Sequence, residues 1–253
     1  RAGVVLYIRD RSVANRLARG DARWYVEAAD RGFDAGALTV GFARRLAGYK
    51  RIGLLTLEPH RVAELLQDVE HPIQLVLAGK AHPQDEEGKR SAQSLFAIKH
   101  TPNTAEHVTF LDNYGLASAA LMVSGCDLWL NLPRPPLEAS GTSGMKAAVN
   151  GALNLSVLDG WWAEAYDGSN GWALSGDVGL DPSVQDARDA AAMFDLVQHE
   201  VIPAFYDRDS RGVPRRWLQM VRASMRRCGP QFAASRMMRD YIDHAYAVGA
   251  QQS

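Results

Sequence analysis

The chain has 253 residues, of which 47% are hydrophobic and 23% are charged, a composition typical of a globular protein with one large or two small domains. Its formal net charge of −1 argues against nucleic acid or a membrane surface as a partner, and no apolar run approaches the roughly 18 residues of a membrane span. The two cysteines, Cys126 and Cys228, lack metal-binding spacing, and their low number favours a reducing, cytoplasmic compartment. The chain starts at Arg1 instead of methionine, so we expect a piece of a longer polypeptide.

Residues 1–36 predict an N-terminal helical segment, because apolar residues recur at helical spacing from Val4 to Leu17. Short apolar strands are then predicted at 37–42, 73–78, 108–111, 128–130 and 152–157. Helical stretches are predicted between them at 51–69 (broken near Pro59), 86–99 and 115–124. Strands that alternate with helices at this spacing predict βαβ units and a parallel sheet flanked by helices. The fold class is therefore α/β, with a Rossmann-like domain over residues 37–183.

From residue 184 onward the pattern is helical only, and we treat 184–253 as a C-terminal helical segment that packs back on the rest of the protein. Helices are predicted at 186–206, 214–227 and 231–247, separated by Pro203, Pro214 and Pro230.

The stretch Arg134–Lys146, RPPLEASGTSGMK, joins the strand at 128–130 to a new helix. Its small residues and hydroxyls precede a helix N-terminus, where unpaired N–H groups and the dipole favour an anion. Lys146 lies one helical turn inside, where its amine could meet the same group. The stretch is not a P-loop, and an ordinary capping turn is the competing interpretation. Glu138 suits a hydrogen bond to a sugar hydroxyl, or it braces the loop.

A basic loop follows the first strand, with Arg44, Arg45, Lys50 and Arg51 within eight residues. Arginine binds oxyanions through two parallel hydrogen bonds and lysine binds them as a point charge, so the loop suits a phosphate. A solvated basic loop is the alternative.

Three further groups of residues follow other strands or turns. His82 is more often a structural histidine than a catalyst, and Tyr114 either contacts a phosphate or packs. Trp161 and Trp162 lie among Asp-Gly turns, which allows a sugar-stacking surface or a pair of core anchors.

Several blocks, in this order, resemble the α-glucan (glycogen, maltodextrin or starch) phosphorylases, above all their shorter bacterial and archaeal branch. The blocks are FARRLAGYKR (42–51), LAGKAHP (77–83), LDNY (111–114), EASGTSGMK (138–146), LNLSVLDGWWAEAYDGSNGW (153–172) and VIPAFYDRDSRGVPRRW (201–217). The resemblance extends from about residue 37 to about residue 245. It implies the C-terminal lobe of a two-lobed glycosyltransferase B-type fold, with the N-terminal lobe missing.

The resemblance implies reversible phosphorolysis of an α-1,4-glucan, in which inorganic phosphate gives α-D-glucose 1-phosphate with retention. Pyridoxal 5′-phosphate would be held as a Schiff base on Lys146, and its phosphate would exchange a proton with the substrate phosphate. Other members of the cofactor site would be Thr142, Gly141, Gly144 and Tyr114.

The same resemblance assigns the substrate site. Arg45 and Lys50 would hold the substrate phosphate and balance two phosphates brought together, which is the physical reason for a basic loop. Glu138, Ser140 and Gly141 would bind hydroxyls of the glucosyl unit, with Tyr49 lining the same pocket. Gly115 and Pro135 stand where some family members have arginines near the site, so those contacts are expected to be absent.

Two other hypotheses remain open. A nucleotide-sugar glycosyltransferase lobe predicts a carboxylate for the ribose and no cofactor lysine, and a non-catalytic cofactor- or glucan-binding fragment predicts binding without turnover. We expect the isolated chain to be inactive, because catalysis needs both sides of a cleft. The preferred glucan, allosteric regulation and a homodimer are left open by the sequence.

Overall fold

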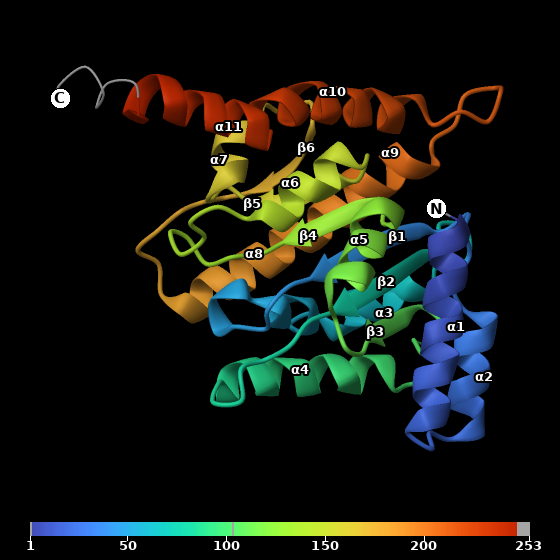
Figure 1. Cartoon of the computed structure of the whole chain (residues 1–253). Helices are drawn as coiled ribbons and strands as arrows, with labels where there is room; N and C mark the ends of the chain where they lie inside the picture. Colours follow the sequence, from blue (N-terminus) through green and yellow to red (C-terminus); the bar gives the residue numbers. More distant parts are fainter. Residues whose placement is uncertain (1, 103, 247–253) are drawn as a thin grey trace.

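The computed structural model describes residues 2–102 and 104–246. Its centre is a six-stranded parallel sheet with the strand order β3-β2-β1-β4-β5-β6, covered by helices (Figure 1). The predicted α/β class and Rossmann-like parallel sheet are therefore confirmed.

Five of the strands lie where the sequence predicts them, within a residue at either end. The strands are β1 (Leu38–Ala43), β2 (Ile73–Ala78), β3 (Val108–Leu111), β4 (Leu128–Asn131), β5 (Leu153–Val157) and β6 (Gly171–Leu174). The strand β6 was not predicted, because it opens at Gly171, whose φ is 153°. The chain there looks like part of an Asp-Gly turn, but it pairs along β5 and forms the edge of the sheet.

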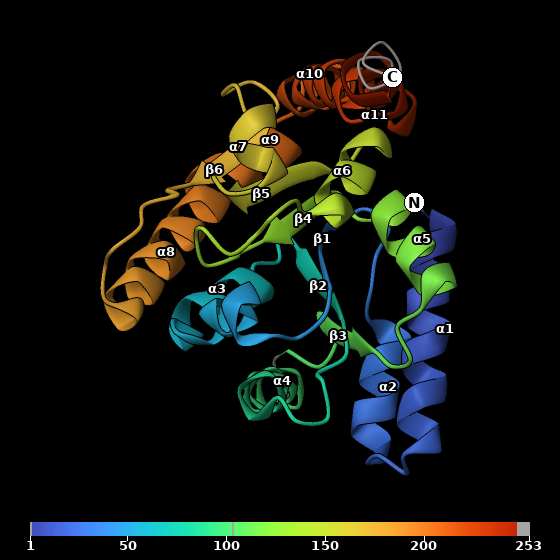
Figure 2. The same cartoon turned by 60° about the vertical axis from the view of Figure 1, so that its left-hand side comes forward.

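The two faces of the sheet are covered by different helices (Figure 2). One face carries α3 (Pro59–Gln67), α4 (Glu86–Lys99) and α8 (Pro182–Leu196), together with the 3-10 turn Ile52–Thr56. The other face carries α1 (Ala2–Ala18), α5 (Leu116–Gly125) and α6 (Thr142–Val149). Residues 1–36 contain two helices instead of one, because α1 turns at Gly20 into α2 (Arg23–Arg31), which packs along it.

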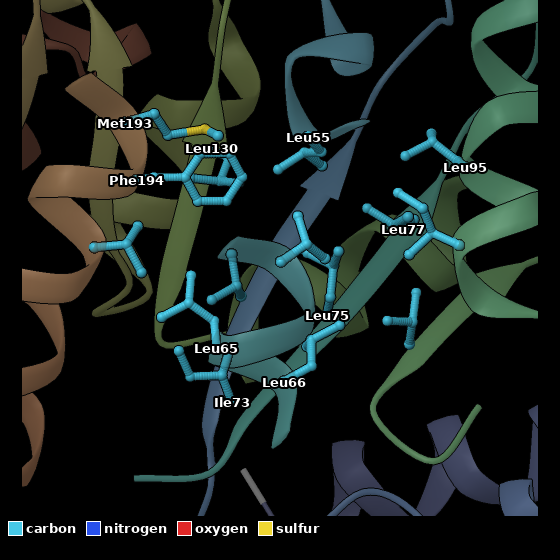
Figure 3. Close-up of a pocket in the computed structure, with 15 residues that line it drawn as sticks. Leu55, Leu65, Leu66, Ile73, Leu75, Leu77, Leu95, Leu130, Met193 and Phe194 are labelled. Carbon is cyan, nitrogen blue, oxygen red and sulfur yellow. The ribbon is translucent and has the colours of Figure 1, made fainter. Parts of the chain in front are cut away.

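The larger part of the core lies between the sheet and α3, α4 and α8 (Figure 3). Leu75 and Leu77 of β2 point there toward Leu66 of α3, Leu95 of α4 and Phe194 of α8, which surround an apolar cavity of about 60 Å³. Burial of such side chains is the dominant favourable contribution to the stability of the fold.

The C-terminal segment is helical as predicted, but its boundaries differ. The predicted helix 186–206 is α8 continued by a π-helical turn (Val197–Val201) and α9 (Ile202–Tyr206). Pro203 lies within this continuous helix, just after the π-helical turn, although proline lacks the N–H of a helical hydrogen bond, and Pro230 lies inside α10 (Arg215–Gln231). Neither proline ends a helix, so their use as boundaries was wrong.

The chain then forms α11 (Ala234–Tyr241) and a π-helical turn (Ile242–Tyr246); the predicted end at 247 lies outside the described residues. A short helix, α7 (Trp161–Ala165), joins β5 to β6. In the part of the chain that the structure describes, we find no helix long and apolar enough to cross a membrane. The division into segments 1–36, 37–183 and 184–253 stays a prediction.

Candidate active site

The strand order places a binding site between two particular strands. The order 3-2-1-4-5-6 reverses direction between β1 and β4, and ligands of such sheets bind outside the carboxyl ends of the strands at that point. The basic loop 44–51 follows β1 and the loop 132–141 follows β4. Two segments that lie far apart in the sequence therefore meet at one edge of the sheet.

Gly141 shapes the entry into α6. It has a φ of 99°, and a Cβ there would lie 2.9 Å from Cδ1 of Trp161, so both the backbone and the space require glycine. The backbone carbonyl of the preceding Ser140 accepts a hydrogen bond from the backbone N–H of Trp161 at 2.8 Å. These contacts hold the N-terminus of α6, which begins at Thr142, against a buried indole.

A cavity of about 780 Å³ lies above the ends of β1 and β4. It contains nine of the ten predicted site residues: Arg45, Tyr49, Lys50, Tyr114, Glu138, Ser140, Gly141, Thr142 and Lys146. Gly144 is the exception, because it lies on the inner side of α6, where a Cβ would be 2.7 Å from Oδ1 of Asn154. Its position indicates close packing of α6 on the sheet, and its assignment to the cofactor site stays a prediction.

Glu138 is the electrostatic centre of this cavity. One carboxylate oxygen lies 2.7 Å from Nη2 of Arg44, and the other accepts a hydrogen bond from Nζ of Lys50. All three side chains are almost entirely buried. Burial opposes the charge on Glu138, but Arg44 and Lys50 outweigh burial and hold its pKa below the usual value. Glu138 is therefore an ionised acceptor.

The four cations of the basic loop have different surroundings. Arg51 is buried, donates to the carbonyls of Leu132 and Pro133, and pairs with Asp186 and Asp189 on α8. It fixes the loop after β4, and so does not serve a ligand.

The other cations face the cavity. Lys50 and Arg44 are engaged with Glu138, whereas Arg45 is exposed and forms no ion pair with any residue in 2–102 or 104–246. Arg45 is thus the cation that a bound anion can engage without breaking an existing pair.

Lys146 and Tyr114 both line the cavity. Lys146 is exposed on α6, one turn from its N-terminus, and Tyr114 is half-buried at the end of β3. Burial raises the pKa of Tyr114 despite the nearby Arg44, so its hydroxyl stays protonated at neutral pH and can donate a hydrogen bond.

The structure decides some of the alternatives left open by the sequence. Trp161 and Trp162 are 2% and 0% exposed, so they are core anchors and form no sugar-stacking surface. His82 is exposed, accepts a hydrogen bond from the Gln84 N–H and does not line the cavity.

Sequence reasoning did not assign a role to Arg44 and missed a row of buried polar residues in the sheet below α6. These are Asn131 of β4 and Asn154 and Ser156 of β5, each 0% exposed. The signal was available, because central strands of a parallel sheet are covered on both faces and are usually apolar throughout. A polar residue there needs a specific partner.

The fold and the cavity define a Rossmann-like lobe with a candidate binding site at the β1–β4 switch point. Residues 32–168 match the family described as Phosphorylase: Carbohydrate phosphorylase. The chain therefore belongs to the carbohydrate phosphorylase family.

Individual relatives agree with this assignment. The chain is 50% identical to glycogen phosphorylase of Mycobacterium tuberculosis over 87% of its own length and 26% of the relative's. It is 42% identical to glycogen phosphorylase of Aquifex aeolicus over 94% of the chain and 35% of the relative. It is 43% identical to maltodextrin phosphorylase of Thermococcus litoralis over 85% of the chain and 25% of the relative. The chain thus spans about a quarter to a third of these proteins.

Proposed function

We propose that this chain is the cofactor- and phosphate-binding lobe of an α-glucan phosphorylase. The reaction is the reversible transfer of a glucosyl unit from an α-1,4-glucan to inorganic phosphate, which gives α-D-glucose 1-phosphate with retention. The observation that carries the proposal is the single cavity that contains Lys146, the N-terminus of α6, Glu138 and the cations of the basic loop.

The residues of the cavity fit pyridoxal 5′-phosphate. Lys146 supplies a primary amine, and the N-terminus of α6 at Thr142, preceded by the left-handed Gly141, supplies N–H groups for a phosphate. Tyr114 lines the same cavity and supplies a protonated hydroxyl. When bound, the cofactor would supply its phosphate as a donor and acceptor of a proton.

The chain's own residues would bind and orient the substrates. Arg45 is available for the substrate phosphate, and Lys50 lines the same cavity with its ammonium shared with Glu138. Ionised Glu138 would accept a hydrogen bond from a hydroxyl of the glucosyl unit, next to Ser140 and Gly141. Tyr49 lines the same wall, with its ring centroid 4.5 Å from Nζ of Lys50, so the ring helps to fix the position of that cation.

Cofactor binding is tested by adding pyridoxal 5′-phosphate to the chain, reducing with borohydride and locating the modified lysine by mass spectrometry. We expect stoichiometric labelling of Lys146 and none in Lys146→Ala. Lys89→Ala, which removes a partly exposed lysine of α4, is the matched control. Labelling spread over several surface lysines, unchanged in Lys146→Ala, would contradict the cofactor assignment and favour a nucleotide-sugar glycosyltransferase lobe.

Activity is tested in a chimera in which this chain replaces the corresponding segment of the Mycobacterium tuberculosis glycogen phosphorylase. We expect the chimera to release glucose 1-phosphate from maltodextrin and phosphate, and the isolated chain to release none, because one lobe supplies one side of the cleft. A folded, cofactor-loaded chimera without turnover would favour a non-catalytic binding fragment.

A further inference from the structure

A row of buried polar side chains lies in the sheet directly below the candidate active site. Asn131 at the end of β4 and Ser156 on β5 are register partners in the parallel pair, and both are 0% exposed. The neighbouring Leu130 and Leu155 point to the apolar core on the opposite face. The polar residues are therefore confined to the face that carries α6 and the cavity.

These residues form one chain of hydrogen bonds that ends at the carboxylate of Glu138. The Ser156 hydroxyl donates to the Val157 carbonyl at 3.0 Å and accepts from Nδ2 of Asn131 at 3.0 Å. Oδ1 of Asn131 accepts from Nη1 of Arg44, and Nη2 of Arg44 donates to Oε1 of Glu138 at 2.7 Å.

The direction of every bond in this chain is determined by chemistry. A guanidinium only donates, so the oxygen of the Asn131 amide must face Arg44 and its NH₂ group must face the Ser156 oxygen. The Ser156 proton is engaged by a backbone carbonyl, which leaves a lone pair for Asn131. The amide is held in one orientation, and it presents one acceptor to the guanidinium.

The position of Arg44 depends on this acceptor. Arg44 is 9% exposed and its Nε has no hydrogen-bond partner among the described residues, so its two terminal nitrogens alone define the orientation of the guanidinium plane. Nη1 is bound to the sheet and Nη2 to the cavity carboxylate. A guanidinium released from Asn131 could swing toward the cavity and would no longer present Nη2 to Glu138.

We propose that Asn131 is a positioning residue for the glucosyl site: it anchors Arg44, which in turn orients Glu138 toward the sugar hydroxyl, and Ser156 sets the orientation of Asn131. The inference rests on the proposed function for the identity of the ligand. It explains why polar residues occupy buried strand positions that would be apolar if packing alone determined them.

The test replaces Asn131 by leucine, which is similar in size and has no hydrogen-bonding atom. Asn170→Leu is the matched control, because Asn170 is equally buried, at 0% exposure, and bonds to Ala165 and Asp167 away from the cavity. Ser156→Ala is a milder second variant that removes only the partner of the Asn131 NH₂ group.

The readout is the carboxyl ¹³C resonance of Glu138 followed against pH, assigned with Glu138→Gln. We expect the titration midpoint of Glu138 to move upward in Asn131→Leu and to move less, in the same direction, in Ser156→Ala. Asn170→Leu should leave the midpoint unchanged, although it also removes buried hydrogen bonds. If Asn131→Leu does not fold, Ser156→Ala decides the question. An unchanged midpoint in a folded Asn131 or Ser156 variant would overturn the proposal.

The chimera provides a second readout. There we expect Asn131→Leu to lower kcat/KM for glucose 1-phosphate about tenfold, the usual effect of losing a hydrogen bond to a charged group, while Asn170→Leu leaves it unchanged. An equal loss in both variants would indicate a general structural effect and contradict the positioning role. If the unmodified chimera is inactive, the proposed function fails, whereas the carboxyl titration still decides the role of Asn131.

Discussion

Arg44 and Glu138 lie 94 residues apart in the sequence, and their side chains meet at 2.7 Å inside the candidate active site. The arginine comes from the loop after β1 and the glutamate from the loop after β4, the two strands between which the sheet reverses its order. Both are almost fully buried. This pair joins the two loops that form the cavity.

The first prediction concerns Glu138→Gln. Removing one partner of a buried ion pair leaves uncompensated charge, so we expect a loss of about 3 kcal/mol in the free energy of unfolding at pH 7. The folded pKa of Glu138 is lowered, so its stabilisation is present above the ordinary glutamate value and is lost as the pH falls through the folded value. Urea unfolding of both proteins at several pH values checks this. A difference that does not shrink in acid would contradict the ionic origin of the effect.

The second prediction concerns Lys50→Ala in the chimera. Lys50 lies with Arg45 on the basic loop, whereas Lys146 lies on α6, so we expect KM for phosphate to rise at least tenfold with cofactor retention unchanged. Initial rates at varied phosphate, with bound pyridoxal 5′-phosphate measured in parallel, give both quantities. Lys80→Ala, an exposed lysine that does not line the cavity, is the control. Equal loss of cofactor and phosphate use would show that the loop is not a phosphate site.

Part of the fold and part of the candidate site could be predicted from the sequence alone. The strands that lead to the cavity are predictable because β-branched and apolar runs alternate with stretches of helical periodicity. The location of the site is predictable because the carboxyl ends of parallel strands meet at one edge of the sheet. Lys146, Thr142 and Gly141 follow from one continuous motif.

Other features were not predictable because they depend on partners that are distant in the sequence. Arg44, Arg45, Lys50 and Arg51 look alike in the sequence, but only the tertiary structure separates them. Asp186 and Asp189 on α8 engage Arg51, and Glu138 engages Arg44 and Lys50. The strand β6 was missed because its pairing with β5 outweighs the local signal of a glycine in a turn.

The third prediction concerns the packing of α6. A Cβ on Gly144 would lie 2.7 Å from Oδ1 of Asn154 and 2.9 Å from Nε1 of Trp161, both buried atoms that cannot move without disturbing the sheet. We expect Gly144→Ala to destabilise the fold by about 2 kcal/mol, the usual cost of overpacking, and to weaken pyridoxal 5′-phosphate binding by displacing the helix that carries Lys146.

Thermal unfolding and cofactor titration check this, with Gly3→Ala as the matched control. Gly3 is also helical, in α1, but a Cβ there meets nothing within 4 Å, so this change should stabilise the protein by about 0.5 kcal/mol. Gly144→Ala with the same stability as Gly3→Ala would show that α6 does not need a close approach to the sheet.

The last prediction concerns Lys99, a buried lysine at the end of α4 that does not line the cavity. Its side chain packs on Phe96, with Nζ 4.0 Å from the ring centroid, and the residue is 3% exposed. Burial, assisted by the positive charge of Arg19, lowers its pKa from 10.5 to about 8. The unfolded chain therefore binds more protons than the folded one between these two values, and stability rises with pH across that window.

Lys99→Met keeps the apolar stem and removes the charge, so we expect it to stabilise the fold by about 2 kcal/mol at pH 7. The gain should shrink as the pH rises from about 8 toward 10.5, the interval between the folded and ordinary values, because the buried amine becomes neutral in the wild type. Lys89→Met, on the same helix at a residue whose side chain is 42% exposed, should change stability little at any pH. Urea unfolding at pH 7 and at more alkaline pH measures the difference; a gain of equal size at both would mean that improved packing, and not the buried charge, is responsible.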